Sequence, residues 1–262
     1  MNQISPTVRI IGAGRAGGAF DLALRRAGWQ VELISHARIT AETSATDGAI
    51  PALEDVDGVD LVLLCVPDRV VADVARSITV SDSVVVAHCS GSLGLDVLAP
   101  APRRASIHPL VPLADPTTGS ALLRGAYFAV SGDPIGHELV ASLDGHPVVV
   151  AESDRVLHHS ACVIASNHLV ALMAQVESVA DKIGVPLDAY LQLARLALDN
   201  VSEFGPSAAL TGPVARGDWG TVERHLEALP AREREAYLAL ARRAAALAGR
   251  EFPDIGLELP EI

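Results

Sequence analysis

Residues 8–18 read Val-Arg-Ile-Ile-Gly-Ala-Gly-Arg-Ala-Gly-Gly, an apolar run that changes into the pattern Gly-x-Gly-x-x-Gly. After a strand and at the start of a helix, this pattern is typical of a turn that holds the pyrophosphate of a dinucleotide. Gly12 then allows the tight turn, Gly14 lets the backbone approach the phosphates, and Gly17 lets the helix pack on the strand. Backbone N–H groups at the helix start face the anion.

The alternative is an ordinary strand-to-helix turn that binds nothing. We favour nucleotide binding, because a β-branched run precedes the glycines and an amphipathic segment, residues 19–27, follows and ends at Gly28. Arg15 and Ala16 lie inside the turn and are expected at the cofactor as well.

Composition and charge exclude several classes of protein. Half of the 262 residues are hydrophobic and only 3% are aromatic, which predicts a large aliphatic core. A net charge of −12 argues against nucleic acid or an anionic membrane as a general partner.

We expect no signal peptide and no membrane span. Cys65, Cys89 and Cys162 show no metal-ligand spacing, so we expect a reducing cytoplasm and no metal site.

The hydrophobic pattern divides the chain in two. Strand and helix patterns alternate up to about residue 150, and several strands are continuous aliphatic runs, as in a parallel sheet covered on both faces. We therefore predict the α/β class, with a doubly wound Rossmann domain over residues 1–151 and an all-helical domain over residues 152–262. The strand patterns lie at residues 8–11, 31–35, 61–65, 84–87, 105–107, 127–130 and 148–150.

The helical part begins with apolar residues that recur at helical spacing from Val156 to Ile183. They predict one helix of about 30 residues, about 45 Å long. Further helices are expected at residues 187–203, 218–228 and 231–248.

The second strand indicates which dinucleotide binds. NAD sites usually place a carboxylate at the end of this strand, but Glu32 comes too early and the end reads Ser35, His36, Ala, Arg38. A hydroxyl, an imidazole and a guanidinium suit the 2′-phosphate of NADP. The alternative is that these are solvated loop residues.

The next two strands end in small and polar residues at the edge of the sheet where ligands collect. Cys65, Val66 and Pro67 are expected to pass the cofactor, and Asp68 to cap the following helix. Ser90 follows the next strand, where it contacts the cofactor or the substrate, or closes a turn.

These segments resemble a bacterial Rossmann-like family of unknown function that is related to ketopantoate reductase and pyrroline-5-carboxylate reductase. The resemblance implies a nicotinamide-binding domain, a helical domain like the C-terminal part of 6-phosphogluconate dehydrogenase, and dimerisation through those helices. The matching segments are residues 10–18, 64–68, 88–92, 107–110, 159–172 and 209–218.

The resemblance also aligns the long helix with a catalytic segment. Ketopantoate reductases carry a lysine followed four and eight residues later by asparagines, and these positions hold His159, Val163 and Asn167 here. The change from lysine to histidine argues against ketopantoate as substrate, and leaves reduction at another C=O or C=N bond.

Histidine titrates near neutrality and suits proton donation in such a reduction. His159 and His108 are therefore the candidate acids, whereas His158 is expected at the exposed start of the helix. Asn167 lies about 12 Å further along a regular helix and is expected to orient the substrate. Ser160, Thr211 and Arg216 are candidate contacts to an anionic substrate, and Asp218 could instead cap the next helix.

We therefore predict an NADP-dependent reductase of a small keto or imino acid that works as a homodimer. The rival hypothesis is a non-catalytic NADP(H)-binding redox sensor.

Overall fold

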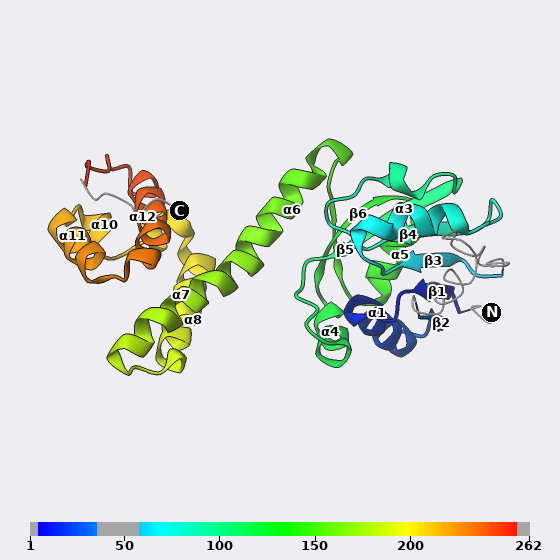
Figure 1. The fold of residues 1–262 in the computed structure, drawn as a ribbon. Coiled ribbons are helices and arrows are strands. Elements are labelled where there is room, and N and C mark those ends of the chain that lie inside the picture. Colours follow the sequence, from blue (N-terminus) through cyan, green and yellow to red (C-terminus); the bar gives the residue numbers. More distant parts are fainter. Residues whose placement is uncertain (1–4, 36–57, 256–262) are drawn as a thin grey trace, which may run out of the picture. The chain divides into compact units, whose positions relative to one another are not determined.

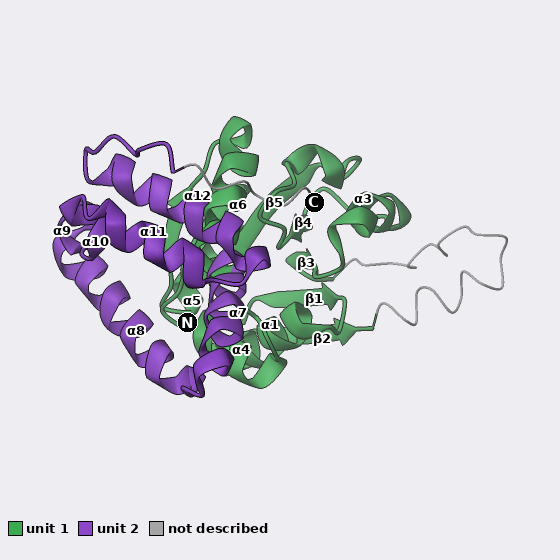
Figure 2. Ribbon diagram, turned by 60° about the vertical axis from the view of Figure 1, so that its left-hand side comes forward, with its two compact units in different colours: residues 1–166 green, residues 167–262 purple. Residues whose placement is uncertain are grey.

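The computed structural model describes residues 5–35 and 58–255 (Figure 1). These residues form two compact units, residues 1–166 and residues 167–262, which are shown in different colours in Figure 2. Each unit is described by itself below.

The first unit contains a seven-stranded sheet in the order β2-β1-β3-β4-β5-β6-β7. The order reverses at β1, so the carboxyl ends of β1 and β3 border the position at which a doubly wound sheet binds its ligand. This confirms the predicted fold class. The strands are β1 (Thr7–Ile11), β2 (Gln30–Ile34), β3 (Leu61–Leu64), β4 (Val85–His88), β5 (Arg103–Pro109), β6 (Tyr127–Gly132) and β7 (His146–Val149).

The last two strands correct the expectation of a parallel sheet. Strands β1 to β5 are parallel, but β6 pairs antiparallel with β5, and β7 runs parallel to β6. The backbone N–H of Leu110 donates to the carbonyl of Tyr127, so β6 starts at the edge where β5 ends. The connection between them therefore makes no crossover, and β6 runs back along β5.

The aliphatic runs in the sequence are explained by two cores, one on each face of the sheet. In β3, Leu61 and Leu63 belong to one core, and Val62 and Leu64 belong to the other. Residues of α1, α4 and α5 complete the first core, and residues of α3 and the 3₁₀ turn η1 complete the second. These elements are α1 (Arg15–Arg26), α3 (Asp68–Ser77), η1 (Leu95–Leu98), α4 (Pro116–Leu123) and α5 (Ile135–Ser142).

The predicted long helix is present and carries one irregular turn. A short 3₁₀ turn, η2 (Glu152–Asp154), leads into α6 (Arg155–Val163), a π-helical turn, η3 (Ile164–His168), and α7 (Leu169–Ala180). The compact units divide after Ser166, whereas the sequence pattern placed the domain boundary near residue 151. The difference arises because the start of α6 is attached to the sheet unit through Arg155.

The second unit has a small core of its own. Apolar residues of α10 (Pro213–Arg216), α11 (Trp219–Ala228) and α12 (Ala231–Leu247) meet around Leu226. By contrast α8 (Leu187–Phe204), which is described over its whole length, buries none of its residues. A short helix, α9 (Pro206–Ala209), and a 3₁₀ turn, η4 (Asp181–Ile183), complete the unit.

The helical run Glu152–Ile183 is long and apolar enough to cross a membrane by length and composition. This corrects the expectation that no segment is long and apolar enough for a membrane span. Ser, Asn and His interrupt the apolar residues of this run, but they add no charge and leave it apolar on average. Length and composition alone are weak support for a membrane span, since a helix that packs against a partner has the same properties.

Candidate functional site

The glycine turn between β1 and α1 is closely packed at two of its three glycines. Gly12 has a φ of +113°, and a Cβ there would lie 2.4 Å from the carbonyl oxygen of Cys65. A Cβ on Gly17 would lie 1.7 Å from the carbonyl oxygen of Gly12. At Gly14, no described atom lies within 4 Å of the Cβ position. The turn therefore requires two glycines for its own packing and leaves open space at the third.

The start of α1 fits an anionic group. Gly14 is the N-cap, it supplies no side-chain hydrogen bond in the described structure, and no acidic residue occupies the first turn. The first N–H groups of a helix have no partner within the helix, so they are available to a phosphate. Arg15 is exposed and Ala16 is half-buried beside them. These residues fit the pyrophosphate of a dinucleotide.

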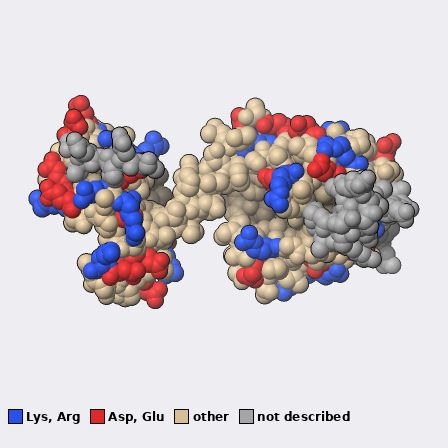
Figure 3. Space-filling model, in the orientation of Figure 1, with Lys and Arg blue, Asp and Glu red and all other residues tan. Residues whose placement is uncertain are grey.

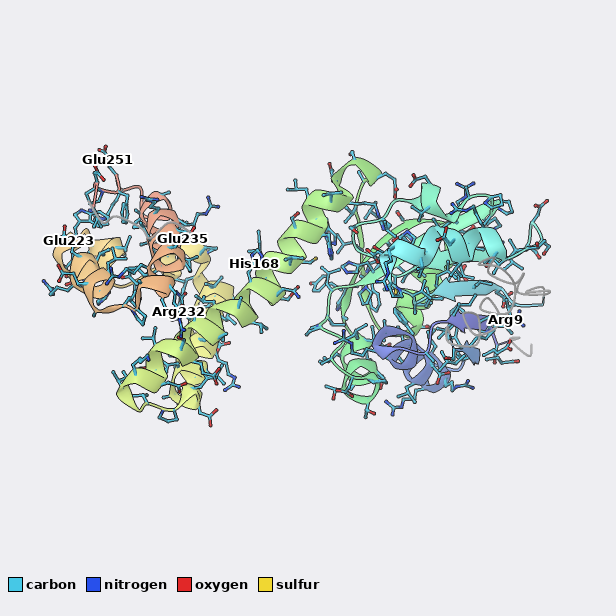
Figure 4. The ribbon with its side chains drawn as sticks, in the orientation of Figure 1. Arg9, His168, Glu223, Arg232, Glu235 and Glu251 are labelled. Atoms are coloured by element: carbon cyan, nitrogen blue, oxygen red, sulfur yellow. The ribbon has the colours of Figure 1, made fainter. Side chains whose placement is uncertain are left out.

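The end of β2 is described only as far as Ser35, which is exposed. His36 and Arg38 lie outside the described residues. Glu32 forms an ion pair of 2.8 Å with Arg9 of β1, which is labelled in Figure 4. Its carboxylate is therefore engaged within the sheet, and the preference for NADP over NAD stays a prediction.

The end of β3 corrects the role expected for Asp68. Pro67, not Asp68, is the N-cap of α3, and it is exposed, whereas Val66 is buried and Cys65 is half-buried. The Asp68 carboxylate oxygen Oδ2 instead accepts hydrogen bonds from the hydroxyls of Ser90 and Ser92, at 2.7 and 3.1 Å. Its carboxylate therefore binds the neighbouring loop, where two hydroxyl donors lie, and does not cap α3.

Ser90 closes a turn, one of the roles that its sequence position left open. Its hydroxyl donates to Asp68 and accepts the backbone N–H groups of Ser92 and Leu93, both at 3.2 Å. The loop after β4 is therefore held rigidly at the carboxyl edge of the sheet. The contact of Ser90 with cofactor or substrate stays a prediction.

Three histidines gather over this loop. His108 comes from β5, and His158 and His159 come from α6, with ring centroids 5.8 Å from that of His108 in both cases. Cys162 lies one helical turn beyond His158, with 3.7 Å between Sγ and Nε2. His158 was expected to be exposed, and this was wrong, because His108 packs against it and leaves it half-buried.

Gly91 brings two of these rings against the loop backbone. A Cβ on Gly91 would lie 2.5 Å from Nδ1 of His159 and 2.8 Å from Nε2 of His108. The glycine is therefore required for the close approach of both imidazoles.

The electrostatics of this site favour the neutral forms of His108 and His158. Burial lowers the pKa of His108 to about 4, with further contributions from positive charge on His158 and His159. Burial also lowers the pKa of His158, and Arg155 adds to that effect. A neutral His108 at pH 7 can still donate a hydrogen bond to a carbonyl oxygen. Within the described residues, the Nδ1 atoms of His108 and His159 are buried without a hydrogen-bond partner.

A buried arginine that the sequence did not single out fixes α6 to the sheet. Arg155 is 2% exposed, and its guanidinium donates to the carbonyl of Leu93 at 2.6 Å and to the hydroxyls of Ser106 and Ser131. Glu152 lies 3.8 Å from it and accepts a further hydrogen bond from Ser131. Arg155 stands only three residues before His158, so it sets the position of the cluster.

The remaining predicted residues are exposed. Ser160 is exposed, and its hydroxyl donates to the carbonyl of Val156 in its own helix. Asn167 is exposed in the π-helical turn and is the first residue of the second unit. The neighbouring His168, labelled in Figure 4, is also exposed and belongs to the same unit. A π turn breaks the regular period on which the expected spacing of His159 and Asn167 rests.

Thr211 and Arg216 are also exposed residues of the second unit. Near them, Asp218 caps α11 by accepting the N–H of Thr221, which confirms the structural role left open for it. The substrate roles of Ser160, Asn167, Thr211 and Arg216 stay predictions.

The chain matches two family models. Residues 1–114 match the Rossmann-like domain, and residues 126–244 match a domain of unknown function, DUF2520. These matches confirm the resemblance seen in the sequence. No curated protein matches the sequence.

Solved structures share the fold over 92% of the chain. A Thermotoga maritima protein is 26% identical, with a TM-score of 0.70 and 98% of its own chain covered. A candidate NADP oxidoreductase from Bacteroides fragilis is 20% identical, with a TM-score of 0.73 and 98% covered. A 1-pyrroline-5-carboxylate reductase from Streptococcus pyogenes is 17% identical, with a TM-score of 0.63 and 99% covered.

Replacing Arg155 with methionine tests the attachment of α6. The variant keeps the aliphatic volume but leaves buried acceptors unpaired, at a cost of about 1–3 kcal/mol for each. We expect a clearly lower free energy of unfolding by urea denaturation. Arg124→Met is the matched control, because Arg124 pairs with Asp144 at the exposed surface and such pairs contribute only about 0–1 kcal/mol. Equal losses in the two variants would contradict the anchoring role.

Proposed function

Because the chain joins a Rossmann-like domain to a DUF2520 domain, we propose that it is an NADP-dependent oxidoreductase that reduces the C=O or C=N bond of a small keto or imino acid. The observation that carries this proposal is the packing of His108 and His159 on Gly91, at the carboxyl edge of the sheet that also carries the glycine turn. Proton donors and a nucleotide-binding turn are the two components that reduction by hydride requires.

The glycine turn and the start of α1 would hold the pyrophosphate of NADP, with the N–H groups of the first turn facing the phosphates. When bound, the reduced nicotinamide supplies the hydride. Hydride addition to a carbonyl or imine leaves a developing alkoxide or amide anion that must receive a proton. His159 would supply that proton. His108 is held against the same loop, but it is neutral at pH 7 and would donate a hydrogen bond to the reacting oxygen or nitrogen instead.

Recognition of the substrate tail is proposed for the polar residues outside the cluster. The guanidinium of Arg216 and the hydroxyl of Thr211 would donate hydrogen bonds to a substrate carboxylate. Charge-assisted hydrogen bonds of this kind are strong. Asn167 would orient the substrate, and Ser160 and Ser90 would add hydroxyl contacts. Solved structures with this fold include reductive aminase and imine reductase, which supports C=N as a target.

The second candidate function is a redox sensor that binds NADP(H) without turnover. It is favoured by His159, which stands where the resemblance to ketopantoate reductases places a catalytic lysine. A sensor would bind NADPH but oxidise none of it with any substrate.

A second copy of the chain is proposed as the partner of the helical unit. In α8, Leu193 is 63% exposed and Phe204 is 57% exposed. Residues 156–176 contain no Lys, Arg, Asp or Glu, and much of this helix is tan in Figure 3. Apolar, uncharged helix faces of this size are typical of protein interfaces. We therefore propose a homodimer formed through these helices.

The choice of cofactor is tested by titrating the protein with NADPH and NADH and following nicotinamide fluorescence. We expect tighter binding of NADPH, because Ser35, His36 and Arg38 replace the usual carboxylate. Arg38→Ala should reduce the difference between the binding free energies of NADPH and NADH by about 1.5–3 kcal/mol, because that is the contribution of a hydrogen bond to a charged group. As a control, Arg124→Ala removes one partner of a surface ion pair and should leave the difference in binding free energy unchanged. Equal affinities in the unmutated protein would contradict the preference.

Turnover is tested by screening keto and imino acids for substrate-dependent oxidation of NADPH. For a substrate that reacts, His159→Ala should lower kcat by about 10²–10⁴-fold, the usual contribution of a general acid, with little change in the Kd of NADPH. His168→Ala, an exposed histidine of the second unit, is the control and should leave both constants unchanged. NADPH binding without oxidation by any acid would favour the sensor.

The oligomeric state is tested by light scattering at micromolar concentration, where we expect twice the chain mass. Leu193→Asp should shift the protein towards the monomer, because a charge would be buried at the interface. Leu122→Asp on α4 is the control, since Leu122 is also exposed, at 42%, but lies in the sheet unit. A monomeric mass for the unmutated chain would contradict the dimer.

A further inference from the structure

Three side chains of the candidate site meet in the manner of metal ligands. His108, His158 and Cys162 each offer one ligand atom, and these atoms all lie within 4.8 Å of one another. His108 comes from β5, whereas His158 and Cys162 lie four residues apart on α6 and therefore share one helix face. The sequence showed no metal-ligand spacing because His108 precedes His158 by 50 residues and Cys162 by 54.

The two helix ligands already stand at the separation that a metal requires. Metal–nitrogen and metal–sulfur bonds of about 2.0 and 2.3 Å at a tetrahedral angle place the ligand atoms about 3.5 Å apart. Nε2 of His158 and Sγ of Cys162 are 3.7 Å apart. Small rotations of the His108 side chain would bring its ring nitrogen to a similar separation from the other two ligand atoms.

The surroundings of the cluster supply a second, independent observation. The Nδ1 atom of His108 is buried with no hydrogen-bond partner among the described residues, and so is that of His159. A buried polar atom without a partner is rare in native proteins, because it loses water and gains nothing in exchange. An ion bound through this nitrogen would give His108 a partner.

We propose that His108, His158 and Cys162 bind a divalent transition-metal ion of the zinc type. Two imidazoles and one thiolate select such an ion over Mg²⁺ or Ca²⁺, which prefer oxygen ligands. On binding, the Cys162 thiol releases its proton to solvent and the thiolate sulfur forms the metal bond. Three protein ligands leave a fourth position for water or a substrate oxygen or nitrogen, as in catalytic zinc sites.

The charges around the cluster permit such an ion. Besides the neighbouring His158 and His159, Arg155 and Asp68 are the charged groups that act on His108, and these two are of opposite sign. The Arg155 guanidinium is partly neutralised by Glu152. Metal binding does not depend on the proposed reductase activity. If both hold, His108 is a metal ligand and His159 remains as the proton donor.

The test uses the full-length chain without a histidine tag, treated with chelator and then titrated with Co²⁺. We expect one Co²⁺ per chain and a thiolate-to-cobalt absorption band, which Cys162→Ser abolishes. His108→Ala and His158→Ala should each weaken Co²⁺ binding by more than about tenfold, since even outer-shell partners contribute about 10–100-fold. Zn²⁺ should displace the Co²⁺.

Two variants outside the cluster serve as controls. Cys89→Ser removes a thiol from the loop after β4, and His146→Gln removes an imidazole from β7, where it packs on Tyr127. Both should bind Co²⁺ as the unmutated chain does. The proposal is overturned by absence of stoichiometric binding, or by a thiolate band that survives in Cys162→Ser. NADPH binding by the same variants, measured separately, reports on the proposed function independently of the metal.

Discussion

The buried guanidinium of Arg155 is the contact on which the candidate site depends. It joins the first turn of α6 to a serine of β5, a serine of β6 and the loop after β4. A buried charge is tolerated only where hydrogen bonds satisfy it, so this arrangement has little freedom to change. As a result, the start of α6 belongs to the sheet unit, and its two histidines pack against His108 of β5.

Much of the sheet unit could be predicted from the sequence, because burial on both faces leaves a direct trace in it. The four buried residues of β3 are all aliphatic since they alternate between two cores. The direction of β6, by contrast, could not be predicted from the hydrophobic pattern. Its apolar pattern would be the same in either direction, and only the site at which the chain leaves β5 decides between them.

The candidate site was predictable in its parts but not in its assembly. His108 could be proposed from its position after a strand, and His159 from the resemblance to ketopantoate reductases. Their contact with His158 and Cys162 could not, because it depends on tertiary packing between segments 50 residues apart. Asp68 shows the same limit: its position suits a helix cap, yet the hydroxyls of a neighbouring loop compete successfully for its carboxylate.

Gly91 has no functional group, yet both imidazoles rest against it. Any side chain at this position would have to displace the two rings together. The histidines are thus coupled through a residue that takes no part in proton transfer or ligand binding. A single substitution at this glycine would therefore displace two imidazoles in one step, without any change in the histidines themselves.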